Sequence, residues 1–241
     1  MTNSERRGQP NPIGGFWGAL SAAEREMLGG FATRRTYGKD AVLCREGEES
    51  GFVVVILGGF AKVFTTSEDG HEAMLGVRGP GDIVGEMGTS GHRPRTATVV
   101  ALNRLSGLIM DAERFRKFLE TSSHASAVLS QVLIERQVES VRRLTMGSAD
   151  GERRLAWLLL ELSERFGERQ PGGAVGINLP LSQNELASWI GKSREMVARA
   201  YRSWREADIV RTGRRAISIV DTAELRRIAD GKRRRRGEEG D

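Results

Sequence analysis

A single cysteine, Cys44, is the most informative shortage in the 241-residue sequence. One cysteine excludes an internal disulfide and any multi-cysteine zinc or iron–sulfur site, so we expect Cys44 to be a small core residue in a strand. The three histidines, His71, His92 and His124, are scattered along the chain, and we therefore expect no metal site. The sequence also offers no recognisable nucleophile–base pair, so we do not expect an enzyme.

Long apolar runs are also missing. No stretch reaches the roughly 18 consecutive apolar residues of a membrane-spanning helix, and the N-terminal MTNSERRGQPNP has no apolar signal core. Hydrophobic residues make up 39% and charged residues 29% of the chain, which is typical of a soluble globular protein. We therefore expect a cytoplasmic protein of one or two domains with no membrane partner.

The excess of positive charge is confined to one part of the chain. Residues 1–150 contain 18 basic and 18 acidic residues, whereas residues 151–241 contain 19 basic and 14 acidic residues and so carry the whole net charge of +5. A local cationic bias is what a phosphate-binding surface requires. Part of it comes from the tail Lys232–Arg236, which also suits a solvated chain end.

The stretch Leu181–Trp204 predicts two short helices joined by a tight turn. Ser182 and Glu185 form a capping box at the first helix, Gly191 permits the positive φ of the turn, and Ser193 caps the second helix. This pattern is typical of the helix-turn-helix that reads the DNA major groove, although an ordinary helix pair with a solvated face shares it. The second helix has an apolar stripe of Val197, Ala200, Tyr201 and Trp204, opposite a charged face of Arg194, Glu195, Arg199 and Arg202.

The chain between Thr36 and Asp111 consists of short apolar or alternating runs separated by Gly-rich turns. Strands at roughly ten-residue spacing are typical of an antiparallel barrel or roll. The fold class expected is therefore α+β, with a jelly-roll-like antiparallel β-roll followed by helices. The predicted strands are Ala41–Cys44, Phe52–Leu57, Phe60–Thr65, Ala73–Val77, Ala97–Leu102 and Leu108–Asp111.

Helices are expected on both sides of the roll: a short pair over Phe16–Gly29, then Ala112–Leu119 and Ser126–Met146. The last of these carries two candidate stripes. Val128 and Val132 suit packing on the roll, and a second stripe with alternating spacings of four and three suits a coiled-coil dimer contact. We favour dimerisation, because a helix-turn-helix gains affinity by binding two half-sites. The second stripe is Ala127, Gln131, Ile134, Val138, Val141 and Thr145.

The remaining segments complete a winged helix-turn-helix: a hinge, an apolar helix, a loop, a β-hairpin wing and a last short helix. In chain order these are Gly147–Gly151, Glu152–Arg165, Gly167–Gly176, the pair Ile209–Arg211 and Ala216–Val220, and Thr222–Ala229. The expected domains are a disordered N-terminus (1–15), the roll (16–125), the dimerisation helix and hinge (126–150), the winged helix-turn-helix (151–222), and a short helix with the basic tail (223–241).

One polar stretch of the roll is not explained by a core. It runs from Gly85-Glu86-Met87-Gly88 to Arg93-Pro94-Arg95-Thr96-Ala97. A buried lone charge is costly, so Glu86 and Arg95 each need a partner, and they can simply pair with each other. Alternatively they bind an anionic ligand. Arg95 and backbone N–H groups at a helix start after Gly85 suit a phosphate, Glu86 suits a ribose hydroxyl, and Thr96 offers a further hydroxyl.

Two blocks of motifs together resemble one family. The block in the roll consists of EG (46–47), LGG (57–59), EDG (68–70), GPGDIVGE (79–86) and RPRTATV (93–99), and the helix-turn-helix block is LSQNELASWIGKSREMVAR (181–199). It is the cyclic-AMP receptor protein (catabolite activator) / fumarate-nitrate reductase regulator family of bacterial transcription factors. The resemblance covers about residues 16–222. It implies a homodimeric, allosteric regulator that binds double-stranded DNA and a cyclic nucleotide, favours cAMP, has RNA polymerase as a partner and needs no metal.

For the ligand, the resemblance implies that Glu86 takes the ribose hydroxyl and that Arg95 and Thr96 take the cyclic phosphate. The family's base-contacting Thr-Ser pair falls near Glu139 and Ser140. Because Glu139 has no donor for adenine and can accept from the guanine edge, cGMP is a rival to cAMP; Glu139 can also be a plain solvated charge. The expected nucleotide site is Gly85, Glu86, Met87, Arg95, Thr96, Glu139 and Ser140.

For the DNA, the resemblance makes Arg194, Glu195 and Arg199 the base readers, with arginine on guanine and glutamate on cytosine contributing about 1–3 kcal/mol each. We expect a TGTGA-like half-site repeated as a palindrome about one helical turn away. Met196 departs from the family, which often has threonine there, so a hydroxyl–phosphate contact is lost. The expected phosphate contacts are Ser182, Ser193 and Arg202, with Gln183 beside them.

Two other functions stay open. One is a DNA-binding regulator of the same fold without a small ligand, in which Glu86 and Arg95 form an internal ion pair. The other is a cyclic-nucleotide-binding module that acts on a protein partner, which leaves the charged face of Leu181–Trp204 unexplained. The iron–sulfur branch of the family needs several cysteines and is excluded by Cys44 alone, and the three histidines do not support a haem branch.

Overall fold

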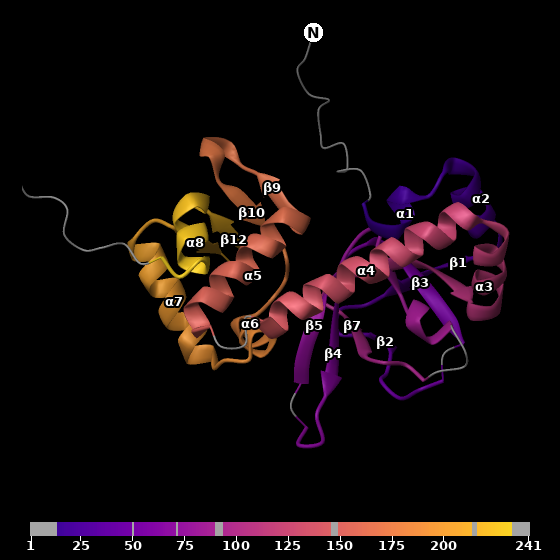
Figure 1. Cartoon of the computed structure of the whole chain (residues 1–241), viewed down its shortest axis with the longest axis horizontal. Helices are drawn as coiled ribbons and strands as arrows, with labels where there is room; N and C mark the ends of the chain where they lie inside the picture. Colours follow the sequence, from indigo (N-terminus) through magenta and orange to yellow (C-terminus); the bar gives the residue numbers. More distant parts are fainter. Residues whose placement is uncertain are drawn as a thin grey trace, which may run out of the picture. The chain divides into compact units, whose positions relative to one another are not determined.

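A computed structural model describes residues 14–49, 51–70, 72–89, 94–145, 149–213 and 216–232 (Figure 1). The predicted disorder before residue 14, the hinge residues 146–148 and the tail after Lys232 lie outside these residues. The chain forms two compact units, and each is described by itself. One comprises Met1–Thr66 and Leu75–Ser140, and the other comprises Ser67–Met74 and Val141–Asp241.

The first unit contains the predicted antiparallel roll. Its two four-stranded sheets have the strand orders β1-β8-β3-β6 and β2-β7-β4-β5, so the predicted fold class is confirmed. The strands are β1 (Thr33–Tyr37), β2 (Val42–Cys44), β3 (Phe52–Gly58), β4 (Ala61–Thr66), β5 (Glu72–Arg78), β6 (Ile83–Val84), β7 (Thr98–Ala101) and β8 (Leu105–Asp111).

Strand β3 is buried on both faces, which explains its continuous apolar run. Val54 and Ile56 point into the roll, whereas Val53 and Val55 belong to a second core formed with the helices. Because side chains alternate along a strand, one strand serves both cores. The helices of this unit are α1 (Gly15–Ala19), α2 (Ala22–Phe31), α3 (Ala112–Thr121) and α4 (Ser123–Thr145) (Figure 1).

Two strands of the roll were not predicted. Strand β1, TRRTY, exposes four of its five residues and has no alternating apolar pattern, and β6 has only two residues. Cys44 is buried in β2, as expected, with its Sγ 4.0 Å from the Ala97 carbonyl oxygen. Burial raises the pKa of the Cys44 thiol, so this cysteine is a core residue rather than a reactive one.

Helix α4 carries both predicted stripes, on different faces. Val128 and Val132 pack against the helical core of the first unit. Three residues of the other stripe are exposed: the exposed fractions are 63% for Ile134, 44% for Val138 and 47% for Val141. An apolar row of this kind on a helix is a candidate contact surface for another chain.

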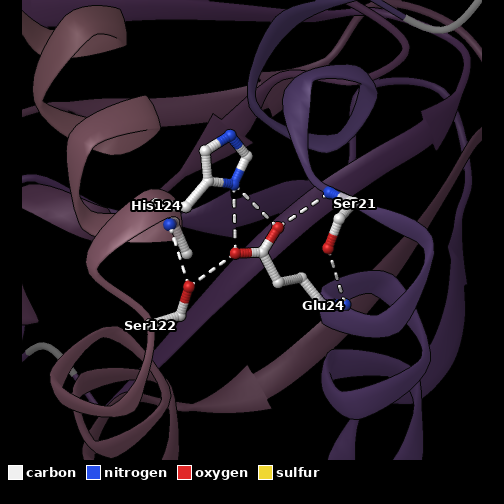
Figure 2. A network of polar contacts seen from close by, with 5 residues as sticks. Ser21, Glu24, Ser122 and His124 are labelled. Carbon is white, nitrogen blue, oxygen red and sulfur yellow. Dashed lines mark hydrogen bonds and ion pairs between the residues drawn. The ribbon is translucent and has the colours of Figure 1, made fainter.

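A polar network joins the start of α4 to α2 (Figure 2). The carboxylate of Glu24 accepts hydrogen bonds from the Ser21 backbone N–H at 2.7 Å and from the Ser122 hydroxyl at 2.5 Å, and His124 Nδ1 lies 2.9 Å away. These hydrogen bonds, led by the one from Ser122, lower the pKa of Glu24 to about 2. The predicted capping box of Ser21 and Glu24 is confirmed, and the same carboxylate links elements 100 residues apart.

The second unit contains helices and the predicted wing in one four-stranded sheet, ordered β11-β12-β10-β9. The predicted loop Gly167–Gly176 is wrong, because it forms β9, the 3-10 turn Pro171–Gly173 and the start of β10; three-residue strands are too short to show a period. No helix in the described ranges is long and apolar enough to cross a membrane. The elements are α5 (Gly151–Phe166), β9 (Gly167–Arg169), β10 (Val175–Ile177), α6 (Gln183–Ile190), α7 (Arg194–Glu206), β11 (Val210–Gly213), β12 (Ala216–Ile219) and α8 (Thr222–Ala229).

Candidate functional site

The polar stretch of the roll begins with a turn over residues 85–89, called the polar turn below, directly after β6. Gly85 has a φ of 85°, and a Cβ at this position would lie 2.3 Å from Arg95 Nη1, so both backbone conformation and space require glycine. The predicted helix start is a single 3-10 turn, η1 (Glu86–Thr89). The backbone N–H groups at its start are therefore aligned over one turn only.

Arg95 is 4% exposed, and its guanidinium donates hydrogen bonds to backbone carbonyl oxygens. Its Nη1 donates to the Gly85 carbonyl at 2.9 Å and its Nη2 to the Phe52 carbonyl at 2.7 Å, with the guanidinium 4.5 Å from the centre of the Phe52 ring. Among the described residues, no atom accepts from Nε and no carboxylate forms an ion pair with Arg95. The positive charge of Arg95 is thus buried without a described counter-ion.

Glu86 is 5% exposed and has a different ion partner from the one predicted. Its Oε1 accepts from Arg136 Nη1 at 2.6 Å, and Arg136 Nη2 donates to the Ile83 carbonyl at 2.7 Å. The ion pair of Glu86 therefore joins the polar turn to α4, and the predicted alternative of a Glu86–Arg95 pair is wrong. Arg136 was not predicted from the sequence, although it follows Val132 by four residues on the face that packs on the roll.

Thr96 and Met87 meet beside these charged groups. Thr96 is exposed, and its hydroxyl donates to Met87 Sδ at 3.7 Å. Met87 is 53% exposed on η1. The Thr96 hydroxyl proton is thus directed at a weak acceptor that an anionic oxygen can replace.

The other two predicted nucleotide contacts lie further along α4. Glu139 is half-buried one turn beyond Arg136, which fits the roll-facing side of the helix better than a fully solvated charge. Ser140 is exposed, and its hydroxyl donates to the Arg136 carbonyl of its own helix at 2.9 Å. Arg136 of α4 is in direct contact with the polar turn, since its guanidinium reaches both Glu86 and the Ile83 carbonyl.

The predicted helix-turn-helix is formed by α6 and α7. Ser182 and Glu185 make the capping box, Gly191 has a φ of 63°, and the Ser193 hydroxyl accepts from the Met196 N–H. The predicted apolar stripe of α7 is buried: its members are each at most 5% exposed, namely Val197, Ala200, Tyr201 and Trp204. Because this apolar face is packed in the core, the opposite face of α7 is held toward the outside.

The predicted DNA-contacting residues are nearly all on the open side of this pair. Gln183 is half-buried, and the exposed members are Ser182, Ser193, Arg194, Glu195, Arg199 and Arg202. Hydrogen bonds from its own backbone N–H and from Ser193 lower the pKa of Glu195, so the carboxylate is ionised and acts only as an acceptor. An ionised acceptor flanked by arginines has the chemistry needed to read base edges.

Contacts that the sequence did not reveal hold both helices on α5. Trp204 Nε1 in α7 donates to Glu152 Oε1 at 2.8 Å, and Arg154 Nη1 donates to the Ile190 carbonyl of α6 at 2.9 Å. Met196 also turns toward α5: a Cβ on Gly151 would lie 2.9 Å from both its Sδ and its Cε. Gly151, predicted to belong to the hinge, is the first residue of α5.

Comparisons with known proteins match both halves of this geometry. The family described as "Cyclic nucleotide-binding domain" matches residues 34–122, and the "Crp-like helix-turn-helix domain" matches residues 153–228. The CRP-like cAMP-activated global transcriptional regulator of Mycobacterium tuberculosis is 30% identical over 185 residues, which cover 76% of this chain and 82% of that protein.

Other relatives extend the same likeness. Transcriptional activator protein FnrL of Cereibacter sphaeroides is 25% identical over 197 residues, which cover 79% of this chain and 78% of that protein. The solved structure of FixK2 from Bradyrhizobium japonicum has a TM-score of 0.73 at 20% identity, covering 82% of this chain and 96% of that chain, so the fold is shared. With both domains matched in the observed order, the chain belongs to the CRP/FNR family of DNA-binding transcription regulators.

Proposed function

We propose that this regulator is a homodimer gated by a cyclic nucleotide, with cAMP favoured, and that it reads a TGTGA-like palindrome. The observation that carries the proposal is the buried guanidinium of Arg95, which has no described carboxylate partner and a free Nε–H. A buried positive charge is costly unless an anion or several hydrogen bonds offset it. The single negative charge of a cyclic phosphate meets that requirement through a charge-assisted hydrogen bond.

The charges around Arg95 agree with a singly charged ligand. Arg95 and Arg136 bring two positive charges, and Glu86 brings one negative charge. The two arginines favour a phosphate, and a carboxylate such as that of Glu86 can accept a hydrogen bond from a ribose hydroxyl. Thr96 would exchange its thioether acceptor for a phosphate oxygen.

Gating would pass through Arg136. Because this residue bonds both Glu86 and the Ile83 carbonyl, a ligand that changes the position of Glu86 changes the anchoring of α4. A ligand shifts such an equilibrium only by its differential affinity for two states. The exposed stripe of Ile134, Val138 and Val141 lies on the same helix, so we propose that ligand binding and dimer geometry are coupled there.

The choice of nucleotide rests on one named relative and one residue. The Mycobacterium tuberculosis relative is described as cAMP-activated, which favours cAMP. The half-buried Glu139 keeps cGMP as the rival, since a carboxylate accepts from the guanine edge. We propose residues 16–125 as the ligand-binding domain, 126–150 as the dimerisation helix and hinge, and 151–222 as the DNA-binding domain of a cytoplasmic regulator with RNA polymerase as its protein partner.

Isothermal titration of the full chain with cAMP and with cGMP tests the ligand. Wild type should bind one of them, and Arg95→Ala should lose at least tenfold in affinity, about the size of a charge-assisted hydrogen bond. Arg116→Ala is the matched control, because Arg116 lies on the exposed surface of α3. Failure of both nucleotides to bind the wild type would refute the gating proposal.

Fluorescence anisotropy with a TGTGA palindrome tests the DNA contacts. Replacing Arg199 by alanine should weaken binding by about 1–3 kcal/mol and relax the preference at one base pair. Replacing Arg202 should weaken binding to all sequences alike and reduce the salt dependence by about one counter-ion. Arg226→Ala on α8 is the control. An Arg199 variant that keeps full sequence preference would refute the assigned base contact.

A second candidate function, a DNA-binding regulator without a small ligand, has one observation in its favour. The Glu86–Arg136 pair at 2.6 Å is already complete without any ligand, as an internal ion pair of a ligand-free regulator would be. That candidate predicts tight, specific DNA binding that neither nucleotide changes. Calorimetry with both nucleotides, and anisotropy of the palindrome measured with and without each nucleotide, distinguish this candidate from the gated regulator.

A further inference from the structure

Met87 occupies an unusual position for a methionine. It is 53% exposed, and its thioether sulfur accepts the hydroxyl hydrogen bond of Thr96, the residue proposed to bind phosphate. Exposed thioethers are open to oxidants, and thioethers are weak hydrogen-bond acceptors. The geometry points to a modification site: we propose that oxidation of Met87 to the sulfoxide lowers the affinity of the roll for its anionic ligand. This inference rests on the proposed nucleotide binding.

The chemistry requires a peroxide as the oxidant. A sulfur lone pair of Met87 attacks one oxygen of hydrogen peroxide, and the O–O bond breaks. The oxygen bound to sulfur gives its proton to the departing hydroxide, so the S=O bond forms and one water molecule leaves. Sulfur loses two electrons and the peroxide gains them. Methionine sulfoxide reductases reverse this change, so the site can be reset.

The consequence follows from the single hydroxyl proton of Thr96. The Thr96 hydroxyl now donates this proton to Met87 Sδ, which lies 3.7 Å from the hydroxyl oxygen. A phosphate oxygen is a stronger acceptor than this sulfur and replaces it easily. A sulfoxide oxygen is a far more polar acceptor and competes with the phosphate for the same proton. Loss of one such hydrogen bond corresponds to an affinity about fivefold lower.

Four other oxidisable residues of the roll and its helices provide an internal comparison, and the half-buried Met196 lies on α7 of the other unit. Met27 on α2 is 52% exposed, almost the same as Met87, but lies outside the candidate site. Met74 and Met110 are buried, and the buried Cys44 thiol has a raised pKa, so all three should react slowly. A ligand-binding effect of oxidation should therefore come from Met87, although Met27 should be oxidised at a similar rate.

The test treats the full-length protein with hydrogen peroxide and removes the oxidant. Peptide mass spectrometry then measures sulfoxide at each methionine, and calorimetry measures the affinity for cAMP and for cGMP. Wild type and Met27→Leu should each bind about fivefold more weakly after oxidation, the size of one hydrogen bond. Met87→Leu should bind equally before and after treatment, whatever its own starting affinity, and sulfoxide reductase should restore the wild type.

Three results would overturn the inference: full Met87 oxidation with unchanged affinity, an oxidation-dependent loss that persists in Met87→Leu, or oxidation of Met27 while Met87 remains reduced. Failure of the untreated wild type to bind either nucleotide would instead refute the proposed function together with this inference. The untreated and treated titrations therefore separate the two failures.

Discussion

Gly85 and Arg95 approach each other so closely that no other residue fits at position 85. Gly85→Ala should lower the free energy of unfolding by about 1–3 kcal/mol and displace the Arg95 guanidinium, because a Cβ would lie 2.3 Å from Nη1 at a positive φ. Thermal unfolding and nucleotide calorimetry measure the two effects. Gly70→Ala is the matched control: Gly70 has a φ of 78° but nothing within 4 Å of its Cβ position. Equal behaviour of the two variants would contradict the predicted collision.

Tyr201 shows a different single-residue effect. Its side chain is 2% exposed in α7, burial raises the pKa of its hydroxyl, and no described residue forms a hydrogen bond with that hydroxyl. Tyr201→Phe should therefore leave the protein as stable or up to about 1 kcal/mol more stable, because an unsatisfied buried group is removed. Urea unfolding measures the change. A clear loss of stability would mean that the hydroxyl has a bound water or another partner.

At this scale the sequence predicts which residues are unusual better than it predicts their partners. Burial of Glu86 and Arg95 follows from two charges inside an apolar strand pattern, and both are at most 5% exposed. The partner Arg136 was not predicted, because it lies 50 residues from Glu86 and resembles any other charged residue of a long helix. A long-range pairing of this kind depends on the tertiary fold.

Among the elements, the junction of α2 and α4 depends on Glu24. Its pKa of about 2 in the folded chain lies below the ordinary 4.5, so the ionised carboxylate stabilises the fold above pH 4.5. That stabilisation is lost as the pH falls from 4.5 toward 2, because protonation then opposes the folded state. Glu24→Gln should lower the Tm at neutral pH and reduce the change of Tm with pH below 4.5. Calorimetry across that pH range measures both effects.

Glu113 is the control for this acid dependence. A hydrogen bond from Lys117 and its charge lower the pKa of Glu113, but both side chains are 63% exposed on α3. Solvent screens such pairs, so Glu113→Gln should change the Tm far less than Glu24→Gln. An equal effect of the two substitutions would mean that the network of Figure 2 does not anchor α4.

Elements with local signals were predicted well, and those defined by their neighbours were not. The capping boxes of α2 and α6 were visible because each is contained in four consecutive residues. Strand β1 is recognised only by its antiparallel pairing with β8, and β9 only by its pairing with β10. Neither strand is apolar or long enough to show a period of its own.

For the whole molecule, the exposed stripe of α4 predicts the state of assembly. Replacing Ile134 and Val138 by aspartate should convert a dimer of 26.5 kDa chains into monomers, because buried carboxylates oppose association. Light scattering after gel filtration measures the mass. Met27→Asp, at a similarly exposed apolar position on α2, should remain dimeric. A dimeric double variant would exclude α4 as the contact.

Helix α7 has a buried face that includes Val197 and Trp204 and an exposed face that includes Arg194 and Arg199. The exposed side chains make few contacts that the fold needs, so they can be exchanged without a cost in stability. A descendant of this chain could therefore acquire a new operator through a few surface substitutions, while its core is inherited unchanged. Diversification of target genes within such a lineage requires very few mutations.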